Sequence, residues 1–357
     1  SGRNVVTGAN RLDEVPPGCH NWGMPYASKP LDSETPTQGA PSLLTARLLV
    51  LVAAVMWSSS GFFAKFHLID DWPGPLRAFW RAAFACVILL PLIRRPQWNW
   101  RLIPATATFA AMNYTYLTAM AKGTAANAIW LQNTAQMWVL IIGVLVFRER
   151  AILRDWLAVI LCGLGIVFIL AFEAQGKSME AVIYGLFSGL FYAGVVLSLR
   201  QLRDFESAWL IGLNHLVTAL VLSPWAWTSY HSGEHWPSGW LWLLLAGFGI
   251  LQMGLPYVLF ARSVKTIPGH EGDGGHRRGD FTSVGVRAHE AAGIGLLEPL
   301  LVPIWAYFVT AGQDVPKWWT LAGGGLIFAG LVVRYLGIPR AERQDDLPPA
   351  ATKDADT

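Results

Sequence analysis

The sequence predicts an all-α integral membrane protein with ten transmembrane helices, arranged as two inverted five-helix repeats. Ten apolar stretches of bilayer-spanning length lie between Leu43 and Leu336. About 20 apolar residues cross the hydrocarbon core as a helix, which satisfies its own backbone hydrogen bonds. The composition agrees, because 53% of the residues are hydrophobic and 14% are charged, whereas soluble domains carry about 25% charged residues. A repeat that relates the two halves of the chain predicts their arrangement.

Short polar turns separate the apolar stretches and fix the order of the helices. We expect spans at residues 45–66, 75–93, 102–121, 125–147, 154–172, 181–199, 208–227, 240–262, 288–310 and 318–337. The basic residues of alternate turns form a large set, namely Arg94, Arg95, Arg101, Arg148, Arg150, Arg154, Arg200, Arg203, Arg262, Lys265, Arg277, Arg278 and Arg287. The remaining turns hold only Lys122, Lys177 and Lys317. Because cytoplasmic loops are enriched in Lys and Arg, both termini are predicted to be cytoplasmic in a multi-pass protein of the cell membrane.

Charge and cysteine content exclude several classes of partner. The formal net charge of +3 is too small to indicate nucleic acid. The three cysteines, two of them inside apolar stretches, suggest neither a disulfide framework nor a metal site. A Gly-rich segment holds His270, His276 and His289, but such flanks fix no ligand geometry and no HExxH helix is present. No metal and no cofactor is therefore predicted.

Polar segments flank the apolar region. Residues 1–42 are rich in Pro and turn formers and lack the pattern of a signal peptide, so we expect them to be disordered. We also expect the charged tail of residues 339–357 to be disordered. Met24 precedes a short polar lead into the first span, and we interpret residues 1–23 as a candidate upstream extension.

The two halves of the chain resemble each other. Residues 114–122 align with residues 257–265. At a larger offset, Asp155-Trp156 followed by Gly163 and Gly165 aligns with Trp318-Trp319 followed by Gly323 to Gly325. These alignments predict a first repeat at residues 43–172 and a second at residues 181–338. Five is an odd number of spans, so the repeats have opposite orientations, as in many secondary transporters with a site near the midplane.

An insertion accounts for the change of offset. The flanks Gly269-His270-Glu271 and Ala288-His289-Glu290 nearly duplicate each other. Joining them restores the alignment of the halves. The segment between them, about residues 270–288, is rich in Gly, His, Arg and Asp and has no apolar period. We expect it to form a flexible, dispensable cytoplasmic loop.

Short motifs, in order and at consistent spacing, resemble one family. They are Trp57 to Phe62, Arg77-Ala78-Phe79 followed by residues 89–92, Phe147 to Arg150 followed by Asp155-Trp156, and Leu297-Glu298-Pro299. Across residues 43–338 the chain resembles the EamA-type branch of the drug/metabolite transporter (DMT) superfamily. The resemblance implies ten helices, a central cavity lined by both halves and movement of small metabolites, often export. Two features depart from the family pattern: Gly312-Gln313-Asp314, where the first half has Arg148-Glu149-Arg150, and the insertion.

Amide side chains share one face of the fourth predicted span. Gln132, Asn133 and Gln136 stand at i, i+1 and i+4 close to mid-bilayer, where polar side chains turn toward protein or water. Substrate binding and interhelical hydrogen bonding are equal alternatives for them. Further candidates for substrate binding, each with packing as the alternative, are Asn113, Tyr116, Trp130, Tyr192 and Gln252.

Glu298 is the clearest acidic residue predicted at mid-membrane. Pro299 cannot donate its backbone hydrogen bond, so we expect the helix to kink or open there. A carboxyl group away from water can carry a proton. Glu298 is therefore the candidate for proton coupling and His215 a second one, with a structural role as the alternative for both. We interpret Arg77 and Arg81 as side chains that snorkel toward the outer headgroups.

Together these observations favour a secondary active transporter that exports small metabolites or drug-like compounds by alternating access. The phosphate-binding motif GxxxxGK[ST] is absent, so an ion gradient or exchange would supply the energy. An intramembrane enzyme and a channel are the alternatives, but the scattered polar residues suggest no catalytic set and no repeated selectivity loop. We expect no enzymatic activity. The expected partners are a small-molecule substrate, the lipid bilayer and a coupling proton or other ion, with a homodimer left open and no nucleic acid.

Overall fold

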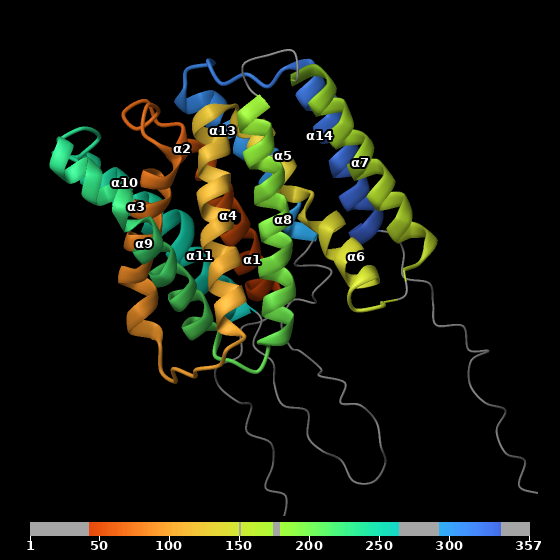
Figure 1. Cartoon of the computed structure of the whole chain (residues 1–357), viewed down its shortest axis with the longest axis horizontal. Coiled ribbons are helices and arrows are strands. Elements are labelled where there is room, and N and C mark those ends of the chain that lie inside the picture. The colour runs from red at the N-terminus through yellow and green to blue at the C-terminus, as the bar shows by residue number, and fades with distance from the viewer. Residues whose placement is uncertain (1–42, 150, 174–178, 264–292, 337–357) are drawn as a thin grey trace, which may run out of the picture. The chain divides into compact units, whose positions relative to one another are not determined.

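The computed structural model describes residues 43–149, 151–173, 179–263 and 293–336, and all regular secondary structure in them is helical (Figure 1). Within these ranges seven helices are long and apolar enough to cross a membrane. The prediction of an all-helical, multi-pass membrane protein is confirmed. The predictions for residues 1–42, for the insertion at 270–288 and for the tail at 339–357 lie outside the described residues.

The helices of the first half lie where apolar stretches were predicted. They are α1 (Leu43–Ser58), α2 (Ser60–Ala64), α3 (Gly74–Leu89) with the 3-10 turn η1 (Leu90–Leu92), α4 (Leu102–Lys122), α5 (Ala125–Asn133), α6 (Ala135–Leu145) and α7 (Leu153–Glu173). Thr124 begins α5, since its side chain accepts a hydrogen bond of 3.2 Å from the Asn127 backbone N–H. Such a cap satisfies one of the four free N–H groups of a helix start.

The second half continues the same alternation. It contains α8 (Met179–Gln201), α9 (Ser207–Ser232), α10 (Leu241–Gly249), the π-helix η2 (Ile250–Gly254), α11 (Leu255–Ser263), α13 (Glu298–Val309) and α14 (Trp318–Leu336). Gly233 ends α9 with a φ of 71°, a left-handed conformation that glycine adopts without strain. A short helical stretch from Gly293 precedes α13.

Helices far apart in the sequence pack side by side. Helix α4 lies along α8, α3 along α9 and α7 along α14 (Figure 1). Helices α7 and α14 cross closely at two glycines. A Cβ atom added to Gly165 would lie only 2.5 Å from the carbonyl oxygen of Gly323. Small residues of this kind let membrane helices approach each other.

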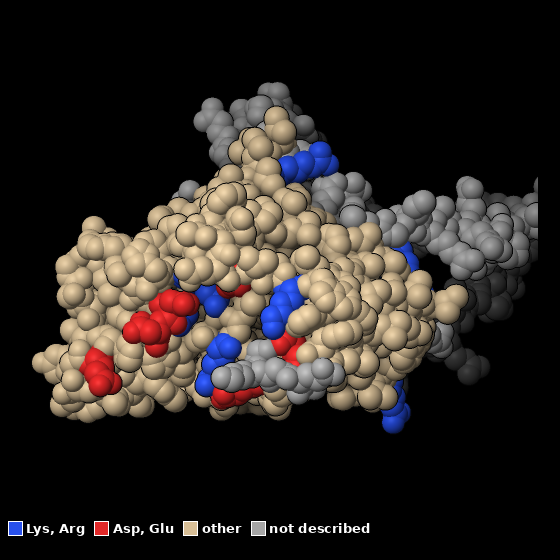
Figure 2. Space-filling view, turned by 90° about the horizontal axis from the view of Figure 1, so that it is seen from above, with Lys and Arg blue, Asp and Glu red and all other residues tan. Residues whose placement is uncertain are grey.

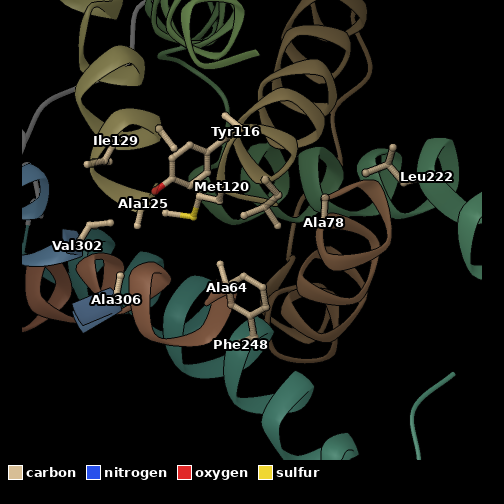
Figure 3. Close-up of a cluster of buried hydrophobic side chains, with 13 residues drawn as sticks. Ala64, Ala78, Tyr116, Met120, Ala125, Ile129, Leu222, Phe248, Val302 and Ala306 are labelled. Atoms are coloured by element: carbon tan, nitrogen blue, oxygen red, sulfur yellow. The ribbon is translucent and has the colours of Figure 1, made fainter. Parts of the chain in front are cut away.

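One core cluster connects helices from both halves. Figure 3 shows Tyr116 and Met120 of α4 near Ile129 of α5, with Val302 of α13 and Phe248 of α10 in the same cluster. All of these side chains are at least 95% buried. The bundle is therefore held together across the two halves and not as two separate cores.

The interpretation of Arg77 and Arg81 as snorkelling side chains is wrong. Arg77 is 0% exposed and Arg81 is 2% exposed. Arg77 donates hydrogen bonds to the backbone carbonyls of Trp72 at 2.9 Å, Ala64 at 2.6 Å and Asp70. Both side chains turn into the helix bundle because carbonyls and polar groups of neighbouring segments offer partners there, which the lipid interface offers only through headgroups.

Candidate functional site

A cavity of about 370 Å³ lies between the helices and draws its lining from both halves of the chain. Its volume falls in the range of about 300–1,000 Å³ that is typical of small-molecule sites. The polar and aromatic side chains that line it are Trp57, Ser60, Arg81, Tyr116, Gln132, Asn133, Gln136, Tyr192, Asn214, Gln252, Tyr257, Glu298 and Tyr335. Of the predicted site residues, the cavity brings together Tyr116, Gln132, Asn133, Gln136, Tyr192, Gln252 and Glu298.

Interrupted helices surround this cavity. Helix α5 ends at Asn133 before α6 begins, and Gln252 lies within the π-helix η2. A turn at residues 296–297 separates the stretch from Gly293 from α13, which confirms the expected opening beside Pro299. Non-helical backbone at membrane depth is tolerated where it lines a cavity, and π-turns are frequent at functional sites. The interruptions therefore turn amide and carboxyl groups toward the cavity.

Some of the amide side chains that line the cavity already have hydrogen-bond partners within the protein, and others do not. Asn133 donates to the Ile129 carbonyl at 2.9 Å, and Gln252 donates to the Trp57 carbonyl at 3.0 Å while its Oε1 has no partner in the described structure. The side chains of Gln132 and Gln136 make no hydrogen bond with the described residues. These two glutamines are thus available to a ligand.

Arg81 is the charged cavity residue that sequence reasoning missed, together with the uncharged lining residues Trp57, Ser60, Asn214, Tyr257 and Tyr335. Its Nη2 donates to Oδ1 of Asn113, whose own Nδ2 donates to the Phe109 carbonyl at 2.8 Å. The guanidinium carbon lies 5.8 Å from the Tyr116 ring centroid and 5.4 Å from that of Phe248, a cation–π arrangement. Asn113, a predicted site residue, is fully buried and is not part of the lining. It holds Arg81 in place instead.

Aromatic rings form one wall of the cavity. The rings of Trp57 and Tyr257 meet edge to face with centroids 5.2 Å apart, and Phe260 lies 5.7 Å from Trp57. The hydroxyl groups of Tyr116 and Ser60 are 3.2 Å apart. This wall offers apolar faces with hydrogen-bonding groups at their edge.

Besides Asn113, two further predicted residues lie outside the lining. Trp130 packs against Gly324 and Phe328 of α14 and is 5% exposed. His215 is fully buried between the rings of Phe109 and Tyr257, with centroids at 5.0 and 6.0 Å. Neither side chain reaches the cavity, so Trp130 is a packing residue here and His215 lies directly behind the aromatic wall.

Glu298 is the first residue of α13 and its side chain borders the cavity. It makes no hydrogen bond or ion pair with any residue that the structure describes. A carboxyl group at the start of a helix is favoured electrostatically, yet this one keeps its acceptor oxygens free. Glu298 can therefore interact with a ligand or a proton.

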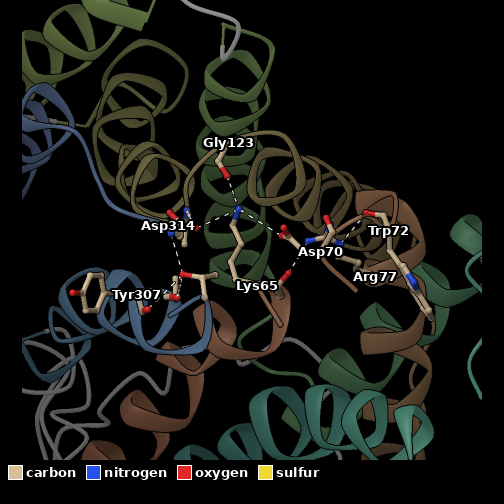
Figure 4. A network of polar contacts seen from close by, with 11 residues as sticks. Lys65, Asp70, Trp72, Arg77, Gly123, Tyr307 and Asp314 are labelled. Carbon is tan, nitrogen blue, oxygen red and sulfur yellow. Dashed lines mark hydrogen bonds and ion pairs between the residues drawn. The ribbon is translucent and has the colours of Figure 1, made fainter. Parts of the chain in front are cut away.

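A polar network around the buried side chains of Lys65 and Asp314 joins several segments at one end of the helix bundle (Figure 4). Lys65 Nζ donates to the Gly123 carbonyl at 2.7 Å and lies 3.3 Å from Asp314 Oδ2 and 4.0 Å from Asp70 Oδ1. Asp314 Oδ2 also accepts from the Ala125 N–H at 3.1 Å, at the start of α5. The network thus ties the end of α2 to the start of α5 and to the connection between α13 and α14.

Figure 2 looks onto this end of the molecule. Lys and Arg side chains lie beside Asp and Glu side chains around the centre of the face, and neither sign forms a broad patch of its own. One exposed example is the pair of Lys122 and Glu180, whose charged atoms are 3.0 Å apart. The charges at this end therefore pair mainly with each other.

Comparison with known proteins decides the family. The model of the EamA-like transporter family matches residues 44–171 and again residues 179–272. The chain belongs to the EamA-like transporter family. This confirms the predicted membership of the drug/metabolite transporter superfamily, and the EamA-family chain is a membrane transporter.

One sequence relative agrees with this assignment. An uncharacterized transporter of Archaeoglobus fulgidus is 26% identical over 263 residues, which cover 72% of this chain and 85% of the relative. A crystal structure of another protein superposes with a TM-score of 0.54 at 16% identity and covers 84% of this chain and 99% of that one. The second likeness shows a shared fold alone.

Proposed function

We propose that this EamA-family protein is a secondary active transporter that exports small metabolites or drug-like compounds by alternating access. The observation that carries the proposal is a cavity lined by both halves, in a bundle that has the buried ion pair of Lys65 and Asp314 at one end. A carrier needs such a central site, with a barrier that can move from one side of it to the other.

The cavity extends away from the end with Asp314. Helix α14 starts just after Asp314, so Tyr335 near its other end lies at the far side of the bundle. Helix α8 starts at the end with Asp314, where Glu180 pairs with Lys122, and Leu199 near its other end also lines the cavity. A cavity whose lining extends to Leu199 and Tyr335, toward the end opposite to Asp314, supports a carrier open to one side.

The proposed topology has ten crossings in two inverted repeats. Helix α4, the stretch Gly293–Val309 and α14 would add three crossings to the seven that length and composition identify. The family model matches twice, at residues 44–171 and 179–272, which supports two repeats. We place them at residues 43–172 and 181–338. By the charge bias of the turns, both termini are cytoplasmic and the end with Lys65 faces outside the cell membrane. The open side is then cytoplasmic, where an exporter loads its substrate.

Energy would come from a coupled ion. We propose that Glu298 carries a proton, because its carboxyl group borders the cavity without a partner in the described structure. His215 lies behind Tyr257 and is the candidate relay. The substrate-binding residues of the proposal are Tyr116, Gln132, Asn133, Gln136, Tyr192 and Gln252.

Reconstitution tests the function. Purified protein would be screened for stabilising compounds among amino acids, nucleosides and vitamins, and the best compound would be followed in proteoliposomes. We expect saturable uptake that is stimulated by unlabelled compound on the opposite side. A Val196→Trp variant, which fills the cavity from α8, should abolish transport. Ile183→Trp on the same helix, at a 44% exposed position, is the matched control.

The alternatives give different results. Flux that does not saturate and shows no counter-stimulation would indicate a channel. Chemical conversion of the added compound would indicate an enzyme. Either result would contradict the proposed carrier.

A further inference from the structure

An exposed segment rich in arginine and tryptophan crosses one end of the helix bundle. This segment, residues 93–101, is called the strap here and connects η1 to α4 (Figure 1). Helix α4 ends at Lys122, next to the Gly123 carbonyl that Lys65 binds, so its start and the strap lie at the opposite end of the bundle. Along the strap the chain has no regular secondary structure, and almost all of its side chains are exposed.

The backbone of the strap is fixed against the start of α9. Glu206 Oε2 accepts hydrogen bonds from the backbone N–H groups of Arg94 at 3.1 Å and Arg95 at 2.7 Å. Trp209 Nε1 donates to the Gln97 carbonyl at 2.7 Å. These contacts hold the strap by its main chain and leave its side chains free to point away from the bundle. The exposed side chains therefore form a surface that is ordered before any partner binds.

The charges of the strap are not used within the protein. In the part of the chain that the structure describes, Arg94, Arg95 and Arg101 form no ion pair, and their side chains donate no hydrogen bond. The guanidinium carbon of Arg101 lies 6.0 Å from the ring centroid of Trp100, which leaves its N–H donors available. Three guanidinium groups within eight residues thus remain open to an external anion.

The carboxylates beside the strap do not neutralise it. Glu206 supplies one negative charge against the three arginines. Arg203 and Asp204, both exposed in the turn before α9, balance each other. Positive charge at a membrane surface attracts anionic lipid headgroups, by an amount that grows with each basic residue. The excess at the strap is large enough to select lipid by charge.

Apolar side chains on both sides of the strap indicate its depth in the membrane. Leu92 before it is 40% exposed and Ile103 after it is 69% exposed, as expected for residues that face acyl chains. Trp98 is 76% exposed although one edge contacts Trp209 at a centroid distance of 4.9 Å, and Trp100 is 72% exposed. Tryptophan is enriched where headgroups meet acyl chains, and arginine reaches from there to the phosphate level.

We infer that the strap binds anionic phospholipid in the leaflet at this end of the bundle. Its arginines bind phosphate oxygens, which the guanidinium fork can contact in pairs. A soluble acidic ligand would use the arginines but leave two indole rings in water, so the combination favours lipid. In the proposed topology this leaflet is the cytoplasmic one. The inference goes beyond the proposed function and does not depend on it.

Bound lipid should stabilise the fold, because the strap joins α3 to α4 and is tied to α9. The test uses purified full-length protein in detergent, washed free of lipid, with thermal stability as the readout. Phosphatidylglycerol would be titrated and compared with phosphatidylcholine of the same acyl chains. We expect an apparent affinity at least about tenfold higher for phosphatidylglycerol. This preference should vanish in 1 M salt, where the screening length falls to about 3 Å.

A triple variant removes the charges of the strap. With Arg94→Gln, Arg95→Gln and Arg101→Gln combined, the protein should bind phosphatidylglycerol no more tightly than phosphatidylcholine. The variant should fold, since these side chains are exposed and have no polar partner among the described residues. Trp100→Ala should instead weaken both lipids by the same factor, because an indole ring anchors at the interface whatever the headgroup charge.

The matched control changes the net charge equally at other places. It combines Lys122→Gln, Arg148→Gln and Lys317→Gln, all at exposed positions outside the strap. The control should keep the wild-type preference for phosphatidylglycerol. Inorganic phosphate at the same concentration is the soluble-anion probe, and it should not stabilise the protein.

Several results would overturn the inference. Equal stabilisation of the wild type by both lipids, a preference that survives in the strap variant or in 1 M salt, or an equal loss in the control would each contradict lipid binding by the strap. Stabilisation by inorganic phosphate as strong as that by phosphatidylglycerol would assign the arginines to a soluble anion. A lipid preference in a protein that does not transport in proteoliposomes would support the strap and contradict the proposed transport function alone.

Discussion

Lys65 Nζ and Asp314 Oδ2 lie 3.3 Å apart and join the end of α2 to the connection between α13 and α14. Their side chains are 10% and 5% exposed. Removing one partner of a buried ion pair leaves an uncompensated charge, at a cost of about 3–5 kcal/mol. The pair is therefore suited to hold this end of the bundle closed in one state and to release it in another.

We predict that Asp314→Ala opens this end. The change removes the partner of Lys65 and the acceptor of the Ala125 N–H together. A cysteine at Ser60, which is 1% exposed and lines the cavity, should then react with an impermeant maleimide added outside cells, in a cysteine-free background. Asp71→Ala, at an exposed position, is the control. Equal labelling in both variants would show that the ion pair does not hold the end closed.

The α7–α14 crossing gives a stability prediction. In Gly165→Ala the new methyl group would lie 2.5 Å from the Gly323 carbonyl oxygen and 2.8 Å from Ile327 Cγ1, so the helices must separate. We expect a loss of about 1–3 kcal/mol, as for overpacked cores, seen as a lower melting temperature of the purified protein. Gly163→Ala on the same helix meets nothing within 4 Å and should change little. A similar melting temperature for both variants would contradict the close crossing.

The helices could be predicted from the sequence because lipid imposes a length and a polarity that can be read directly. The span predicted at residues 154–172 corresponds to helix α7 at Leu153–Glu173. The span predicted at residues 181–199 corresponds to helix α8 at Met179–Gln201. The site was predicted in part. The face shared by Gln132, Asn133 and Gln136 follows from helical periodicity, and all three residues line the cavity.

Side-chain direction is what the sequence left undetermined. Trp130 lies on the side of α5 that meets α14, and His215 is covered by Phe109 and Tyr257. Depth and residue type alone do not reveal these neighbours. A signal for Arg81 was present, however, because it stands one helical turn beyond Arg77, at i+4, too far into the span for the usual reach of snorkelling to an end.

The proposed orientation predicts which loops are accessible from outside. A cysteine at Ser238, between α9 and α10, should react with an impermeant maleimide in intact cells, because the charge bias places this connection outside. A cysteine at Asn99, an exposed residue between η1 and α4, should react only after the cells are permeabilised. The reverse pattern would invert the topology and place the end with Lys65 in the cytoplasm.

Glu298→Gln tests the proposed proton coupling. Gln has nearly the same shape as Glu and cannot release a proton, so the fold and the melting temperature should be kept while a pH gradient no longer drives uphill accumulation. Exchange of labelled for unlabelled substrate needs no net proton movement, and it should persist at reduced affinity and without dependence on pH. Both assays would use the same proteoliposomes, with and without a pH gradient.

Glu180→Gln, at an exposed position on α8, is the control that should behave as the wild type. Gradient-driven accumulation by Glu298→Gln at the wild-type level would show that the coupling proton is carried elsewhere, and His215 would then be the next residue to test, because it lies directly behind the aromatic wall of the same cavity.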